Sequence, residues 1–290
     1  MQGDFLFLFS AMNFICVDGE FREDDKPVLM HNNRSFRYGD GVFETMKLLK
    51  GNLLLNQLHA DRLTRSLEFL QYRVAPSFHL ELIQNQIFEL AHKNNCSDLG
   101  RVRLTIFRGH GGLARNTDGF HYLIECTPVS PLVNVWNQDG LSIGIFDGAH
   151  KTCDRLANIK SSNFLPYSLA ALYASGNCFD DCILQNTRGG LADATIANLF
   201  LIHQQTISTP SLDEGCIDGV MRRYLLQKFH ESNLPCYERA VTIDDLQTAD
   251  EIFLTNAVYG IRWVKKFADK LYTSTFISKL YEDFVAPIFV

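Results

Sequence analysis

The sequence has few prolines, no long apolar run and no excess of positive charge, and each of these absences excludes a class of protein. It has only 8 prolines among 290 residues, and its even composition excludes collagen, coiled coil and a disordered chain. No apolar run approaches the roughly 20 residues that a membrane-spanning helix needs. Because 27 basic residues face 33 acidic ones, the net charge of −6 provides no general field for nucleic acid or an anionic membrane. With 46% hydrophobic residues the chain is predicted to be globular and water-soluble, so an anionic ligand must bind at a local site.

The eight cysteines are scattered singly, with no CxxC pair and no histidine at the spacing of a zinc partner. We therefore expect reduced thiols, no metal site and a cytoplasmic protein. The apolar run Phe5–Phe9 is shorter than the core of a signal peptide, and no positive charge precedes it. No export is implied. Residues 1–11 are interpreted either as an extension or as a misassigned start, because a strand-like stretch follows Met12.

The first part of the chain alternates between strand and helix patterns. Lys50-Gly51-Asn52 separates two apolar runs and is typical of a hairpin turn. Apolar residues recur at helical spacing in two later segments, and two strand-like runs flank a Gly-rich stretch. The expected elements are strands at 14–17, 42–49, 53–55, 101–107 and 122–127, and helices at 59–72 and 80–91. This pattern predicts a small α+β domain over residues 1–127.

The best linker follows that domain, at residues 128–136, because the prolines of Thr127–Pro131 cannot continue a strand ladder. Residues 137–290 form the expected larger domain, in which strands dominate and helices intervene irregularly. The expected elements there are strands at 141–146, 181–185, 199–202, 207–209, 235–241 and 251–256, and helices at 162–175 and 219–231. This order supports neither a strict βαβ barrel nor a solenoid, and no strand is followed by GxGxxG.

Two segments could carry chemistry on their own residues. In Gly215–Arg222, Asp218 is a possible N-cap of the following helix, whose first amides, on Val220 and Met221, would suit a phosphate. An ordinary capped helix fits that segment as well. Lys160 lies between a polar stretch and a helix, where a partly apolar environment would favour its free amine as a nucleophile. A solvated lysine is the alternative.

Taken together, five separated motifs resemble the class IV aminotransferases, which are fold-type IV pyridoxal-phosphate enzymes. The motifs are Arg37–Thr45, His59–Leu63, Lys160–Asn163, Asp193–Phe200 and Gly219–Arg222, followed by Thr255-Asn256. The resemblance runs from about Asn13 almost to the C-terminus. It implies an α+β or α/β fold with a small N-terminal domain and a larger mixed-sheet pseudo-barrel domain that binds the cofactor.

The resemblance also implies roles for single residues. Lys160 matches the lysine that holds pyridoxal 5'-phosphate covalently and later moves the substrate Cα proton. Arg62 and the amides of Val220 and Met221 match the groups on the cofactor phosphate. Asp193 stands where the family normally has a glutamate, whose carboxylate keeps the pyridine nitrogen protonated so that the ring accepts electrons. Because aspartate is one methylene shorter, the cofactor tilts, the backbone closes in, or a water bridges the gap.

Other features bear on the choice of reaction within the family. Lys160-Ser-Ser-Asn163 resembles the KxxN of lyases and D-amino-acid enzymes, and Asn256-Ala257 resembles the Asn-Ala of lyases. We assign Asn256 to the cofactor site. Arg108, in a loop like the Arg-Gly-x-Gly-Gly of lyases, is predicted to meet a substrate carboxylate, or else to be a solvated arginine in a hairpin. Tyr38 is assigned to substrate binding, although it could equally belong to the core.

The resemblance therefore implies 4-amino-4-deoxychorismate lyase activity, which gives 4-aminobenzoate and pyruvate for folate synthesis. The alternatives are a D-amino-acid or branched-chain aminotransferase of the same fold, and a catalytically silent relative that binds the cofactor, the last motivated by Asp193. We expect a homodimer that acts on a small molecule and binds neither nucleic acid nor a membrane. In this fold the small domain of one subunit helps to wall the site of the other.

Overall fold

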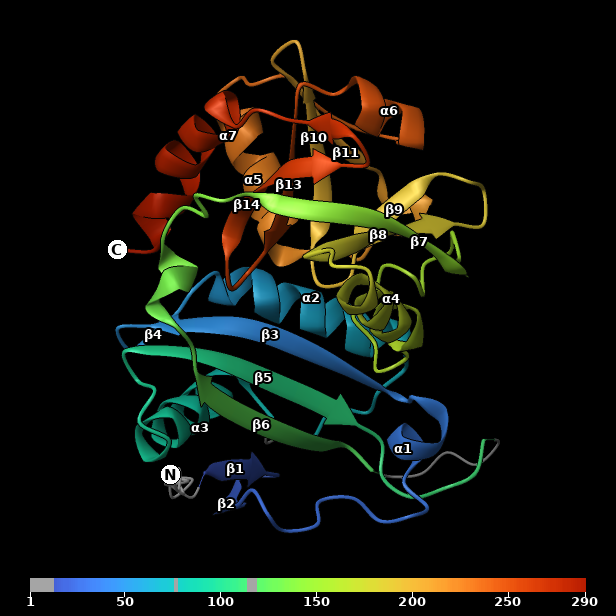
Figure 1. The fold of residues 1–290 in the computed structure, drawn as a ribbon. Helices are drawn as coiled ribbons and strands as arrows, with labels where there is room; N and C mark the ends of the chain where they lie inside the picture. The colour runs from blue at the N-terminus through green and yellow to red at the C-terminus, as the bar shows by residue number, and fades with distance from the viewer. Residues whose placement is uncertain (1–12, 76–77, 114–118) are drawn as a thin grey trace, which may run out of the picture.

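The computed structural model describes residues 13–75, 78–113 and 119–290, so the residues interpreted as an extension lie outside the described part. Two sheets form two layers, one above the other (Figure 1). The first sheet is antiparallel throughout, in the order β2-β1-β6-β5-β3-β4. Its strands are β1 (Phe14–Val17), β2 (Glu20–Glu23), β3 (Gly41–Leu49), β4 (Asn52–Leu53), β5 (Leu99–Phe107) and β6 (His121–Pro128).

Alternation along β3 and β5 gives the first sheet two different faces. One face carries Met46, Val102 and Leu104, which share a core with helices α2 (Asn56–Phe69) and α3 (Leu80–Lys93). These helices form because their apolar residues recur every three or four positions. The intervening residues of the same strands lie on the opposite face, from which Lys47 donates to the Val258 carbonyl of the second layer at 2.9 Å. A short helix, α1 (Arg34–Tyr38), precedes β3.

The second sheet is mixed, in the order β12-β11-β10-β13-β14-β7-β8-β9, and β15 pairs with β14. Strand β7 lies between two parallel neighbours, β14 and β8, whereas β9 runs antiparallel to β8. The strands are β7 (Leu141–Lys151), β8 (Asp181–Asn186), β9 (Leu191–Ala194), β10 (Asn198–His203), β11 (Thr206–Pro210), β12 (Cys236–Arg239), β13 (Glu251–Asn256), β14 (Gly260–Phe267) and β15 (Lys270–Leu271). The connections that follow β9 and β13 lie on the side of this sheet that faces the first one.

Helices cover the second sheet on different sides. Helix α4 packs against β7 and β8, and α5 packs against β13 and also contacts α2 of the first layer. The helices are α4 (Leu165–Gly176), α5 (Val220–Glu231), α6 (Ile243–Thr248) and α7 (Thr275–Leu280), followed by a π turn (Tyr281–Val285) and a 3-10 turn (Ala286–Ile288); two further 3-10 turns cover Pro131–Asn134 and Leu212–Glu214. Within the described ranges no helix has the length and apolar character to cross a membrane.

Most of the expected elements appear within a few residues of their predicted ends. Lys50 and Gly51 take the positive φ values, 49° and 74°, that the predicted hairpin turn requires. The prediction omitted α1, β2, β9, β14, β15, α6 and the C-terminal helices. It also began α4 three residues too early, because Pro166 lies at the first turn of that helix. The expected N-cap Asp218 is wrong, since Gly219 takes that place, while the carboxylate of Asp218 pairs with Arg223.

Candidate active site

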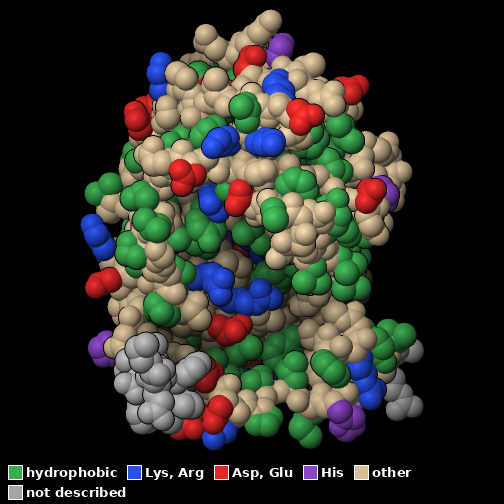
Figure 2. All heavy atoms as spheres, in the orientation of Figure 1, with side chains coloured by type: hydrophobic (Ala, Val, Ile, Leu, Met, Phe, Trp, Pro, Cys, Tyr) green, Lys and Arg blue, Asp and Glu red, His purple; other side chains and the backbone are tan. Residues whose placement is uncertain are grey.

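A cavity of 380 Å³ lies between the two layers. Figure 2 shows a hollow in the middle of one face of the molecule, with Lys and Arg side chains at its edges. One wall is the face of β3 and β5 that points away from α2 and α3. The other wall consists of strand ends and connecting segments of the second sheet. All six residues predicted for the cofactor line this cavity: Arg62, Lys160, Asp193, Val220, Met221 and Asn256. The other two predicted site residues, Tyr38 and Arg108, are not among the residues that line it.

Backbone pairing with β3 brings Lys160 to the cavity. Ser161 forms an isolated bridge with Val42, and the Phe43 amide donates to the Lys160 carbonyl at 3.0 Å. The Lys160 amine lies 4.6 Å from the ring centroid of Phe43 and 5.3 Å from that of Phe164. Burial, assisted by the positive charge of Arg62, lowers the pKa of the Lys160 amine to about 7. A substantial fraction of this amine is therefore uncharged and nucleophilic at neutral pH.

The start of α5 forms one end of the cavity. Its N-cap is Gly219, where a Cβ would lie 1.9 Å from Oδ1 of Asn198, so only glycine fits. The amides of Val220 and Met221 in the first turn have no partner within the helix, because the first turn of any helix leaves its donors free. The hydroxyl of Thr255, which also lines the cavity, is buried without a hydrogen-bond partner in the described structure. These donors converge on one end of the cavity.

Arg62 lies at the same end, on α2. Its Nε donates to Oε1 of Glu44 at 2.8 Å, and a second nitrogen pairs with Oε2 of the same carboxylate. A third nitrogen donates to the Asp218 carbonyl at 3.2 Å, just before α5. Glu44 also accepts from His59 Nδ1 at 2.7 Å. Burial alone would raise the pKa of Glu44, but the charge of Arg62 and the bonds from His59 and Arg62 outweigh it and lower the pKa to about 2.

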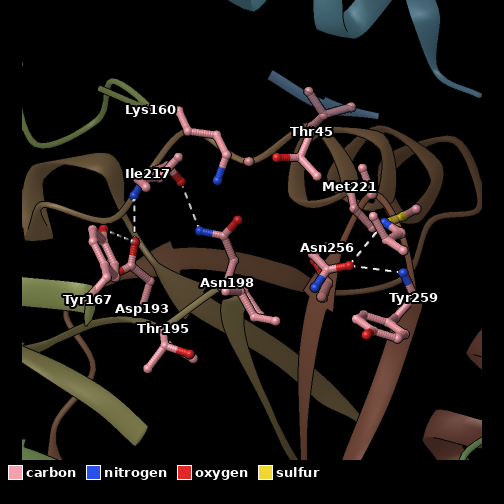
Figure 3. A pocket seen from close by; sticks show the side chains of 18 of the residues that line it. Thr45, Lys160, Tyr167, Asp193, Thr195, Asn198, Ile217, Met221, Asn256 and Tyr259 are labelled. Atoms are coloured by element: carbon pink, nitrogen blue, oxygen red, sulfur yellow. Dashed lines mark hydrogen bonds between the residues drawn. The ribbon is translucent and has the colours of Figure 1, made fainter. Parts of the chain in front are cut away.

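Asp193 lies at the opposite end, on β9. Its Oδ2 accepts from the Ile217 amide at 2.8 Å and from the Tyr167 hydroxyl at 2.9 Å, and the amine of Lys151 lies 3.2 Å away. Figure 3 shows Asp193 on one side of the cavity, Met221 and Asn256 on the other, and Lys160 between them. The Oδ1 atom of Asn256 accepts from the amides of Val258 and Tyr259 and so fixes the turn that closes this wall.

The arrangement fits a flat, protonatable ring that bears a phosphate. Helix amides, an unpartnered hydroxyl and an arginine suit the phosphate at one end. A buried carboxylate suits a protonated ring nitrogen at the other end. An amine of lowered pKa between them suits a covalent bond to an aldehyde on the ring. These groups are the ones that pyridoxal phosphate requires.

Comparison with known proteins agrees with this fit. The sequence profile of the family described as Amino-transferase class IV matches residues 41–267. The chain belongs to this family. Its cofactor is therefore pyridoxal phosphate, and its fold is that of the fold-type IV enzymes.

Relatives within the family carry different activities in their names. The chain is 30% identical to the aminodeoxychorismate lyase of Bacillus subtilis over 85% of its own length and 84% of that protein. Its fold matches that of a branched-chain aminotransferase from Thermoproteus uzoniensis with a TM-score of 0.84 at 19% identity, covering 96% and 95% of the two chains. A hypothetical aminotransferase from Mycobacterium tuberculosis, solved in a PLP-bound form, matches with a TM-score of 0.82 at 20% identity, covering 96% and 99%. The chain is thus a class IV pyridoxal-phosphate enzyme whose relatives include both lyases and transaminases.

The structure places Tyr38 and Arg108 outside the lining of the cavity. The guanidinium of Arg108 donates to Asp40 Oδ1 at 3.0 Å and to the Gln71 carbonyl at 3.0 Å, and it stacks 4.2 Å over the ring of Tyr72. Tyr38 ends α1 and is 42% exposed. Within one chain, therefore, Arg108 is engaged with Asp40, Gln71 and Tyr72, and Tyr38 is exposed.

Sequence reasoning missed four residues that shape the cavity. Arg101 and Arg103 line it from β5, and Tyr167 lines it from α4, whereas Lys151 lies behind Asp193 on β7. The i, i+2 spacing of the two arginines on a predicted strand was a usable signal that they share a face. Nothing local in the sequence connects Lys151 or Tyr167 with Asp193, because their contact depends on how three separate elements pack.

Proposed function

We propose that the protein is a 4-amino-4-deoxychorismate lyase. The observation that carries this proposal is the pair of arginines, Arg101 and Arg103, in the wall of the cavity. The substrate has two carboxylates, one on the ring and one on the enolpyruvyl group, so it needs two cations. An amino-acid substrate with an apolar side chain has only one carboxylate.

The two arginines lie on one face of β5, since alternate residues of a strand point to the same side. Arg103 stacks with its guanidinium carbon 3.7 Å above the ring centroid of Phe43, and its Nε donates to Thr105 at 3.3 Å. The acid nearest to it, Glu125, is 3.8 Å away, and both side chains are about two-fifths exposed, so this pair is weak. The guanidinium of Arg103 is thus oriented by an aromatic ring and remains available to an anion.

The residues of the chain have separate tasks in this reaction. When bound, pyridoxal phosphate supplies an electron sink for the carbanion at the substrate Cα. Lys160 removes the Cα proton, the bond between the ring carbon and the enolpyruvyl oxygen breaks, and that oxygen leaves with the electron pair. The leaving enolpyruvate takes up a proton and becomes pyruvate, while the six-membered ring becomes aromatic. Asp193 holds the proton on the ring nitrogen, and Phe43 and Phe164 keep water away from the Lys160 amine.

The lyase name of the Bacillus subtilis relative supports this proposal, as does Ala257 in the wall of the cavity, where it offers no hydroxyl to the phosphate. A D-amino-acid or branched-chain aminotransferase is the second candidate, because the same fold occurs in a branched-chain enzyme. The two reactions differ in what they consume. The transaminase needs a 2-oxo acid as amino acceptor, whereas the lyase needs no second substrate.

The test uses the purified holoprotein with 4-amino-4-deoxychorismate alone. We expect 4-aminobenzoate and pyruvate in equal amounts, with no requirement for a 2-oxo acid. Arg101→Gln and Arg103→Gln should each raise KM by about 10-fold or more, the loss expected for one charge-assisted hydrogen bond. Arg22→Gln is the matched control, because this arginine lies on β2 in an exposed pair with Glu20. Amino-group transfer from an amino acid to a 2-oxo acid, without lyase products, would overturn the proposal in favour of the second candidate.

We further propose that the active form is a homodimer and that Tyr38 and Arg108 act across its interface. The 42% exposure of Tyr38 and the absence of both residues from the cavity lining of one chain support this role, as do the exposed apolar residues Met30, Phe36 and Leu113 near them in sequence. Involvement in folate synthesis and a cytoplasmic location accompany the lyase proposal and stay predictions.

A further inference from the structure

A buried lysine lies behind the carboxylate that faces the cofactor ring. The side chains of Lys151 and Asp193 are 6% and 3% exposed, and the Lys151 amine lies 3.2 Å from Oδ2 of Asp193. Lys151 itself does not line the cavity. It comes from β7, which pairs with β8, and β8 in turn pairs with β9, the strand that carries Asp193. Lys151 is therefore not expected to contact the substrate directly.

Lys151 and Tyr167 form one network around Asp193. The Tyr167 hydroxyl bonds to both the Lys151 amine and the Asp193 carboxylate, and the Lys151 amine also lies 3.4 Å from the Ala157 carbonyl. The Tyr167 ring stacks on Phe164, with 4.3 Å between centroids, and Phe164 lines the cavity. Three donors, including the Ile217 amide, thus fix a carboxylate that is one methylene shorter than the usual glutamate.

The ionisation states in this network follow from its burial. Burial, together with the negative charge of Asp193, raises the pKa of the Tyr167 hydroxyl well above its usual value, so this group remains a donor. Burial raises the pKa of the nearby Cys216 thiol to about 12. The titratable groups that face Asp193 include these two, Lys160 from across the cavity, and Lys151. Of these four, Lys151 is the one that forms an ion pair with the carboxylate, at 3.2 Å.

A cation behind a carboxylate competes with a cation in front of it. The ammonium of Lys151 reduces the negative potential that Asp193 presents to the cavity, and with it the attraction for a proton on the ring nitrogen. We propose that Lys151 is a positioning residue that holds Asp193 in place and limits how strongly it retains the proton on the cofactor ring nitrogen. This inference rests on the site proposed above, in which Asp193 faces that nitrogen.

The test measures the ring nitrogen directly, with pyridoxal phosphate labelled with ¹⁵N bound to the holoprotein. The nitrogen chemical shift is followed against pH, because it differs between the protonated and unprotonated ring. Lys151→Met should raise the midpoint of this transition by about one pH unit or more. Lys151→Arg keeps the charge and should restore the wild-type midpoint. Asp193→Asn should lower the midpoint, since it removes the partner charge.

Two controls keep the outcomes distinct. Lys47→Met removes a different buried lysine and should leave the midpoint unchanged. If Lys151→Met fails to fold, Lys151→Gln removes the same charge and retains a donor. An unchanged midpoint in the neutral Lys151 variants, with the expected fall in Asp193→Asn, would overturn this inference and leave the site assignment intact. An unchanged midpoint in Asp193→Asn would overturn the assignment of Asp193 and this inference with it.

Discussion

Replacement of Glu44 by glutamine tests whether the buried pair with Arg62 holds the phosphate end of the cavity together. Glu44 on β3 accepts hydrogen bonds from both Arg62 and His59, and among the described residues no other charged group does so. Glutamine keeps the shape and one acceptor but loses the charge. Arg62 then remains buried, at 6% exposure, without its counter-charge.

Two arguments give the size of the loss in the free energy of unfolding that we expect for Glu44→Gln. The pKa of Glu44 falls from 4.5 to about 2, which corresponds to about 3 kcal/mol of stability in the folded state. Removal of one partner from a buried ion pair costs about 3–5 kcal/mol. Because the pKa is lowered on folding, this stability is present above about pH 4.5 and is lost as the pH falls toward 2. Glu44→Gln should therefore lower the free energy of unfolding by about 3 kcal/mol at pH 7 and flatten its dependence on pH below 4.5.

Urea unfolding of the apoprotein at pH 7 and pH 4 measures both effects. Glu89→Gln on α3 is the matched control, because its pair with Lys93 is exposed and should contribute less than about 1 kcal/mol. A cofactor titration on the same variant should show weaker binding, since Arg62 loses the carboxylate that orients it. A loss below about 1 kcal/mol at pH 7, with an unchanged acid limb, would refute the reasoning.

Three further predictions concern other parts of the chain. Borohydride reduction of the holoprotein should label the peptide that contains Lys160, and a label on another lysine would contradict the assignment. Burial lowers the pKa of Lys47 to about 7, so the unfolded chain binds more protons above that pH and stability should rise between pH 7 and 10. Urea unfolding of Lys47→Met over this range should show a smaller rise, and an identical rise would exclude Lys47 as its source. Equilibrium sedimentation at micromolar concentration should give a species heavier than the 33.0 kDa monomer, whereas a monomer alone would remove the dimer proposal.

Local patterns predicted the elements that are long and strongly periodic. In α3, Ile83, Ile87 and Leu90 lie on one face and are all buried, as their spacing predicts. The hairpin of β3 and β4 followed from its turn residues alone, because Lys50 and Gly51 must take positive φ there. In such segments the local preference and the tertiary environment agree, so the sequence suffices.

Short segments that are buried on all sides could not be predicted in this way. Strand β9, which carries Asp193, has four residues, all of them buried, and shows no alternation that a two-residue period would reveal. The motif therefore identified Asp193 as a site residue, but its position followed only from the pairing of β9 with β8. The domain boundary at residues 128–136 stays a prediction.

The arginine pair of β5 shows where sequence reasoning stopped one step short. The predicted strand already contained Arg101 and Arg103, and its other face already carried apolar residues at 102, 104 and 106. A strand with one apolar face must bury that face, so two arginines on the opposite face must lie at a surface or in a cavity. Only the packing of the second sheet decides between a surface and a cavity. Because this sheet packs against β3 and β5, the face that carries the two arginines forms a wall of the cavity. The resemblance of the Gly-rich loop to the Arg-Gly-x-Gly-Gly of lyases drew attention to Arg108 instead. In the folded chain the guanidinium of Arg108 is bound to Asp40, while Arg101 and Arg103 line the cavity that also contains Lys160.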